Sequence, residues 1–144
     1  MDNNGKDIKT GVAENVYERF SGVTSCLQRV MNVLFMRTPV GGICKIDMVE
    51  EAIDYLLDLY TEKYETMIGQ MSDKQRMVFF AIATEGKAIG ITGGTFIKKY
   101  RLWSSSSVVS AVKGLMEKDF VTIEDGAYLV YDPFFGLWMR RETK

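Results

Sequence analysis

The sequence predicts a mainly α-helical protein with one small β-hairpin near its end. Three observations lead to this fold class. Apolar residues recur at three- and four-residue steps through most of the chain, as on the buried face of a helix. Only two prolines interrupt 144 residues, so long stretches lack a helix breaker. After residue 119 the apolar period changes to two, which is typical of strands. The length suits one domain, or two small ones sharing a core.

The first helical pattern runs over residues 12–36 and carries a single apolar stripe. We expect a break near Ser21-Gly22, and Pro39 with Gly41-Gly42 should end the pattern. The stripe consists of Val16, Phe20, Val23, Leu27, Val30, Val33 and Leu34.

A second helical pattern begins at Asp47 and ends near Gly69. Asp47 and Glu50 have the spacing of a capping box, in which two side chains satisfy the free amides of a first turn. The periodicity leaves open whether this run is one helix or two helices joined near Tyr60.

Three shorter helices are predicted next. Ser72 and Gln75 form a capping box for a helix that Glu85-Gly86 closes. Thr92 is expected to cap residues 93–99, and Ser104 or Ser105 to cap a helix ending near Lys118. The buried face of this last helix should consist of Val108, Ala111, Val112, Leu115 and Met116.

A β-hairpin follows these helices. Residues 120–123 and 128–131 are rich in strand formers, and Asp125-Gly126 between them is a strong turn signal. The aromatic segment 132–138 is either a docking patch or, as its size favours, part of the core. Three short helices and a hairpin follow the order of a winged helix-turn-helix domain. We therefore expect a disordered head at 1–11, a helical region at 12–70 and a winged helix domain at 71–144.

Composition argues against an enzyme. Histidine is absent, which excludes Ser-His-Asp and Cys-His catalysis and any imidazole metal site within the chain. We expect no metal and no cofactor. Cys26 and Cys44 indicate buried thiols of a reducing, cytoplasmic compartment, and a disulfide between them is the less favoured alternative. No apolar stretch is long enough to span a bilayer, so no membrane association is expected.

Charge is divided unevenly along the chain. Residues 1–70 carry a net −4 and residues 71–144 a net +3, and no acid lies between Lys87 and Lys113. A local positive field attracts anionic partners, although a solvated basic face is the plainer interpretation. Serine hydroxyls at the start of a helix can also bind phosphate. The candidate nucleic-acid or partner-binding residues are Lys87, Lys98, Lys99, Arg101, Ser105, Ser106, Ser110 and Lys113.

Three motifs carry a resemblance to a known family. The first joins Ser72-x-x-Gln75 to Ala81-Ile82-Ala83-x-Glu85-Gly86 and Phe96-Ile97-x-Lys99-Tyr100. The second runs from Ser106 to Asp119, and the third, the most specific, from Tyr128 to Trp138. Residues 71–139 resemble the C-terminal winged helix domain of AAA-like P-loop ATPases of Bacteroidetes and archaea. Residues 16–70 look, more loosely, like the helical lid that precedes it.

The chain departs from that family at the nucleotide site. A P-loop requires Gly-x-x-x-x-Gly-Lys-Ser/Thr, and no glycine here is followed by such a pair. The resemblance therefore implies a regulatory or interaction region without ATPase activity, whose partner is another protein or the missing ATPase core. The alternative is weak binding to the DNA backbone, because the expected reading face holds serines and Lys113 rather than Arg, Asn or Gln. Pairing of the acidic and basic halves, within one chain or in a homodimer, is also left open.

Overall fold

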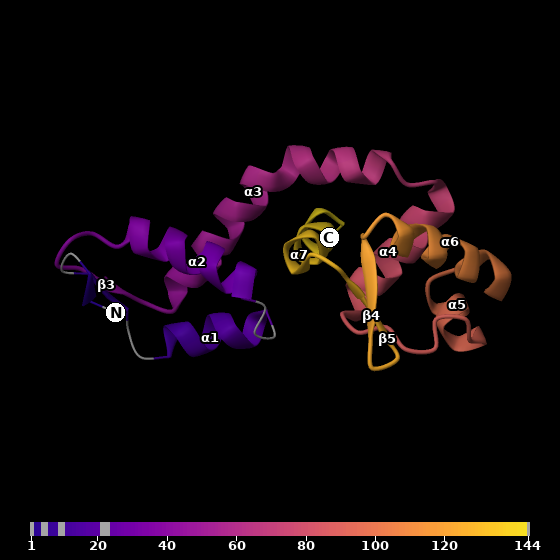
Figure 1. Ribbon diagram of the computed structural model, residues 1–144, viewed down its shortest axis with the longest axis horizontal. Helices are drawn as coiled ribbons and strands as arrows, with labels where there is room; N and C mark the ends of the chain where they lie inside the picture. The colour runs from indigo at the N-terminus through magenta and orange to yellow at the C-terminus, as the bar shows by residue number, and fades with distance from the viewer. Residues whose placement is uncertain (1, 4–5, 9–10, 21–23, 144) are drawn as a thin grey trace. The chain divides into compact units, whose positions relative to one another are not determined.

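The computed structural model describes residues 2–3, 6–8, 11–20 and 24–143, and it is mainly helical with a small β-hairpin near its end, as predicted. Its residues group into two compact units, 1–60 and 61–144, with the division inside helix α3 (Asp47–Gly69) (Figure 1). The sequence places its boundary later, at 70/71. α3 is one continuous helix, which answers the question left open at Tyr60.

The first unit is built from two helices, the start of α3 and three very short strands. Helices α1 (Val12–Arg19) and α2 (Thr24–Arg37) lie on either side of residues 21–23, so the pattern is divided where expected, although the break itself falls outside the described residues. Strand β1 (Asp2–Asn3) pairs antiparallel with β2 (Lys6–Ile8), which pairs parallel with β3 (Ile43–Cys44). The head expected to be disordered thus contains two strands, and its residues 1, 4–5 and 9–10 lie outside the described part.

The core of this unit is apolar and includes both cysteines as buried thiols. Burial raises the pKa of the Cys44 thiol. The capping box expected at the start of α3 is not found, because Asp47 is itself the first helical residue and Glu50 forms an ion pair with Arg19 of α1. The buried apolar side chains are Val12, Val16, Phe20, Cys26, Val30, Val33, Leu34, Cys44, Val49, Ala52, Ile53, Leu56 and Leu57.

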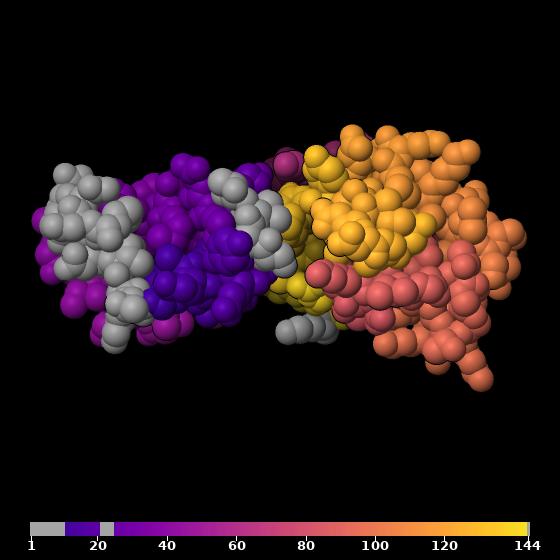
Figure 2. All heavy atoms as spheres, turned by 60° about the horizontal axis from the view of Figure 1, so that its bottom comes forward, coloured from indigo at the N-terminus to yellow at the C-terminus, as the bar shows by residue number. Residues whose placement is uncertain are grey.

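The second unit follows the order that the sequence predicts. Its helices after α3 are α4 (Asp73–Glu85), α5 (Gly94–Lys99) and α6 (Ser105–Glu117), and its hairpin joins β4 (Val121–Glu124) to β5 (Ala127–Val130). Asp125 and Gly126 both have positive φ, as a tight hairpin turn requires. Ala88 forms an isolated bridge with Tyr128, so the segment after α4 lies beside β5, and Figure 2 shows residues near 90 against the hairpin.

Helix starts in this unit confirm two predictions and correct one. The Ser72–Gln75 capping box is present in both directions, and the Ser104 hydroxyl accepts from the Ser107 amide at 3.2 Å. The cap expected from Thr92 is wrong, because Gly93 occupies that position without a side-chain bond. The Thr92 carbonyl instead accepts from the Ser105 hydroxyl at 2.7 Å, which joins the segment before α5 to the first residue of α6.

The aromatic segment is a helix, α7 (Pro133–Glu142), which the sequence analysis did not predict. Its Phe134, Phe135 and Trp138 are buried, so the core interpretation is confirmed. Asp132 caps this helix by accepting from the Phe134 amide at 3.0 Å, and Pro133 is compatible with a first helical turn because its missing N–H needs no partner there.

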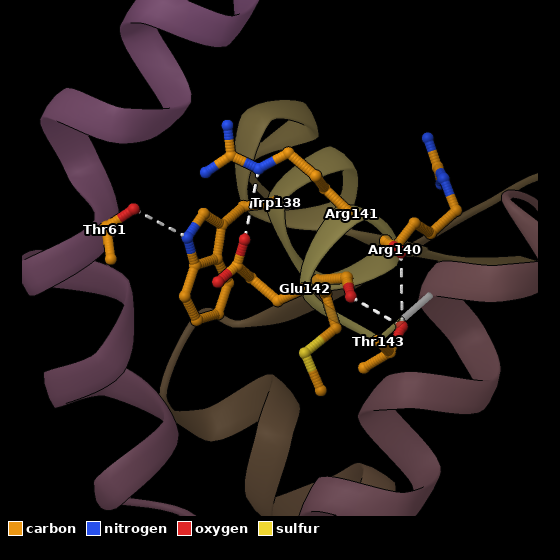
Figure 3. A network of polar contacts seen from close by, with 7 residues as sticks. Thr61, Trp138, Arg140, Arg141, Glu142 and Thr143 are labelled. Atoms are coloured by element: carbon orange, nitrogen blue, oxygen red, sulfur yellow. Dashed lines mark hydrogen bonds and ion pairs between the residues drawn. The ribbon is translucent and has the colours of Figure 1, made fainter.

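The last turns of α3 pack against α7. The Tyr64 hydroxyl donates to Asp132 at 2.9 Å. The Trp138 indole N–H donates to the Thr61 hydroxyl at 3.0 Å, as Figure 3 shows. The Tyr64 ring stacks on Phe135, with ring centroids 4.6 Å apart. Phe79 and Phe120 also contact Phe135, which places it at the centre of the aromatic core. Residues 61–69 are thus structurally part of the second unit.

Candidate functional site

Helix α6 buries most of the apolar face that the sequence predicts and presents the opposite face to solvent. Val108, Ala111, Val112 and Leu115 are buried, whereas Met116, also expected inside, is only half-buried. We call the opposite side the outer face of α6. Its members are exposed: Ser105, Ser106, Val109, Ser110 and Lys113.

The predicted cations lie before this helix. Lys98 and Lys99 form the last turn of α5, where the carbonyl end of a helix favours positive charge. Arg101 follows with a φ of 56°, a left-handed conformation that turns the chain toward α6. Lys87 lies apart from them, directly after α4 and next to the bridge at Ala88. All four side chains are exposed.

Among the predicted cations, Lys99 forms an ion pair within the described residues. Its ammonium contacts the Glu85 carboxylate at 2.9 Å, and the Tyr100 hydroxyl donates to the same oxygen. The Tyr100 bond and the Lys99 charge hold the pKa of Glu85 below its usual value, and Glu85 in turn raises the pKa of Lys99. Lys99 therefore ties α5 to the end of α4 and is less available to a partner.

The other predicted cations have no ion pair with a carboxylate in the described part of the chain. Lys87, Lys98, Arg101 and Lys113 are therefore free to meet an anionic group. The hairpin turn carries charge of the opposite sign, because its acidic residues Glu124 and Asp125 are both exposed. The surface thus combines scattered positive charge near α6 with an acidic hairpin tip.

Two residues that the sequence analysis did not count among the site residues lie beside the outer face. The Lys74 ammonium is 5.3 Å from the centre of the Trp103 ring, and Trp103 is 53% exposed. This exposure favours a partner-facing position of Trp103 over inward packing. No sequence pattern marks Lys74 as a site residue, because it stands between Ser72 and Gln75 in the capping motif.

Close packing of α4 against α6 positions these residues. Gln75 Oε1 accepts from the Ser72 amide at 2.9 Å, while its Nε2 lies over Gly114 of α6, where a Cβ would collide with it. Gly114 therefore leaves the space that the Gln75 amide occupies while it caps α4. This contact brings the start of α4 next to Ser106 and Ser110.

Comparison with known families identifies this architecture. Residues 62–141 match the model of a family described as a probable winged helix domain. The chain belongs to this family. The match begins inside α3, in agreement with the contacts of Thr61 and Tyr64. No curated protein and no solved structure matches the chain.

The winged helix domain gives the elements their roles. α5 and α6 correspond to its helix-turn-helix, and β4–β5 corresponds to its wing. Such a domain supports DNA or protein interaction in general. Among the described residues, no helix has the length and apolarity to cross a membrane, and no three acidic or thiol side chains gather as metal ligands.

Proposed function

We propose that the winged helix domain is a non-catalytic interaction module that engages a protein partner through the outer face of α6. The observation that carries this is the chemistry of that face. Val109 is 51% exposed at its centre, serines surround it, and Lys113 is its one charged side chain. Readers of DNA bases use Arg, Asn or Gln there, because those side chains bond to two atoms of a base edge. An apolar centre with a polar rim is instead typical of protein interfaces.

The acidic wing supports the same proposal. Glu124 and Asp125 at its tip would repel a phosphate backbone, whereas a protein surface can offer them lysine or arginine. The motif resemblance suggests the kind of partner: the nucleotide-binding core of an AAA-like P-loop ATPase, with the chain acting as its regulatory region in the cytoplasm. The chain contributes no catalytic group in this proposal.

A pull-down with a purified ATPase core tests the proposal. The core is taken from an ATPase of the resembled type and lacks its own C-terminal region. We expect retention by the wild-type chain and loss with Val109→Asp, which places a charge at the centre of the outer face. Lys45→Glu, an exposed charge change in the first unit, serves as the control. Equal retention of Val109→Asp and wild type would refute the proposed face.

Weak, backbone-directed DNA binding is the second candidate. It is favoured by the four cations without a carboxylate partner in the described structure, Lys87, Lys98, Arg101 and Lys113. Binding of this kind is salt-sensitive, because each phosphate contact releases counterions. Titration of labelled duplex DNA at about 50 mM and about 200 mM salt distinguishes the candidates. Salt-dependent binding that is lost in Lys98→Glu/Lys113→Glu, but kept in Lys45→Glu, would support the DNA candidate.

A further inference from the structure

A polar hollow lies between the start of α4 and α6, beside the outer face. Its volume is about 280 Å³. Apart from the methyl group of Ala111, its lining offers hydroxyls, one amide and one ammonium, and no carboxylate. We call it the serine hollow, and it is lined by Ser72, Lys74, Gln75, Ser106, Ser107, Ser110 and Ala111.

The geometry of the serine hollow is set before any ligand arrives. Gln75 is held by its bond to the Ser72 amide and by its position over Gly114. On the other side, the Ser104 hydroxyl bonds the Ser107 hydroxyl at 3.1 Å and the Ser107 amide at 3.2 Å, which fixes the first turn of α6. Donors that are already ordered lose little entropy when a ligand binds.

Lys74 supplies the positive charge of the hollow. It forms no ion pair within the described ranges, whereas the neighbouring Asp73 pairs with Arg76 at 3.6 Å. The Lys74 ammonium lies above the exposed Trp103 ring, so a cation and an aromatic surface meet at the same place. A ligand here would find charge, hydroxyl donors and an apolar ring within one small region.

We propose that the serine hollow binds a carboxylate side chain from an acidic segment of the protein partner, with Lys74 as its counter-charge and Trp103 packing beside the peptide. This deepens the proposed function and rests on it. Charge complementarity indicates the occupant: the lining has donors and a cation but no acid. An acidic peptide can bind through contacts with this hollow alone. A nucleic acid lying along α6 would also meet the wing, whose exposed acidic residues offer no cationic contact.

An NMR titration of the ¹⁵N-labelled chain of 144 residues tests the proposal. The probe is a capped hexaglutamate peptide at about 50 mM salt, and the readouts are the Ser106, Ser107 and Ser110 amides and the Trp103 indole. We expect saturable shifts at these signals. Lys74→Glu should weaken binding by about tenfold or more, equivalent to about 1.4 kcal/mol. Lys45→Glu, the same charge change at an exposed lysine of the first unit, should change affinity less than about twofold.

Other outcomes would overturn the assignment. Absence of shifts with hexaglutamate, or equal shifts in Lys74→Glu, would refute it. Shifts produced by inorganic phosphate or duplex DNA, but not by hexaglutamate, would assign the hollow to phosphate instead. The pull-down distinguishes failure of the serine hollow from failure of the proposed function. Loss of binding to the ATPase core in Val109→Asp, with full retention in Lys74→Glu, would support the outer face as the interface and refute the role of the hollow.

Discussion

Replacement of Trp138 tests whether the end of α3 belongs to the winged helix domain. The side chain is 5% exposed, it is tilted against Tyr64 and Phe135, and its indole N–H donates to Thr61 (Figure 3). Trp138→Ala removes a large buried ring, so we expect a loss of about 3–5 kcal/mol in the free energy of unfolding. Urea unfolding followed through amide signals of α4 and α6 measures the stability of this unit directly.

A double-mutant cycle then isolates the contact between α3 and α7. Thr61→Val removes the acceptor of the indole N–H and should cost about 1–3 kcal/mol, the range for a buried donor left unsatisfied. Trp138→Phe should cost less in the Thr61→Val background than in wild type, because the donor is then no longer needed. A loss below about 1 kcal/mol for Trp138→Ala, or strict additivity in the cycle, would refute the packing described here.

Three further predictions concern other contacts of the same unit. Gly114→Ala should not raise the free energy of unfolding of wild type, because the new Cβ displaces Gln75. In the Gln75→Ala background the same change should raise it by up to about 1 kcal/mol, as measured by urea unfolding. A stabilised Gly114→Ala single variant would contradict the packing of Gln75 over Gly114. The pKa of Glu85 is lowered, so its contribution to stability is complete above the ordinary value of 4.5 and is lost as pH falls through the lowered value. Between about pH 6 and about pH 3, the urea midpoint of unfolding should therefore fall less steeply in Glu85→Gln than in wild type. Equal slopes of midpoint against pH in the two proteins would contradict this. The Arg140 guanidinium donates to the Ala83 carbonyl at 2.7 Å near the end of α4, so Arg140→Met should cost about 1.5–3 kcal/mol in the same unfolding assay, and no change would contradict this capping role.

Local signals in the sequence were sufficient to predict most of the second unit. The Ser72–Gln75 capping box, the Ser104 cap and the Asp125-Gly126 turn depend on residues only a few positions apart, and each forms as predicted. The predicted buried face of α6 follows from its period in the same way. These elements are set by short-range geometry, which a single sequence contains.

Features that depend on tertiary packing were not predicted. Segment 132–138 is rich in aromatic residues and short in length, so its helical period was not recognised, although the capping pattern Asp132-Pro133 was a usable signal. The contacts of Thr61 with Trp138, and of Lys74 with Trp103, join residues 77 and 29 positions apart. No local pattern specifies such pairs.

The predicted site residues share exposure to solvent but differ in charge pairing. The eight predicted residues are all exposed, as a binding surface requires. Lys99, however, pairs with Glu85, which precedes it by 14 positions, and that pairing follows only from the packing of α5 against α4. The role of these residues in binding stays a prediction.

The most direct test of the central claim is the affinity of the chain for an isolated ATPase core, compared between wild type and Val109→Asp by titration calorimetry. We expect saturable binding of the wild type, a loss of affinity of at least about tenfold in Val109→Asp, and unchanged affinity in the Lys45→Glu control. Equal affinity of the wild type and Val109→Asp, or failure of the wild type to bind together with tight, sequence-specific binding to duplex DNA, would contradict it.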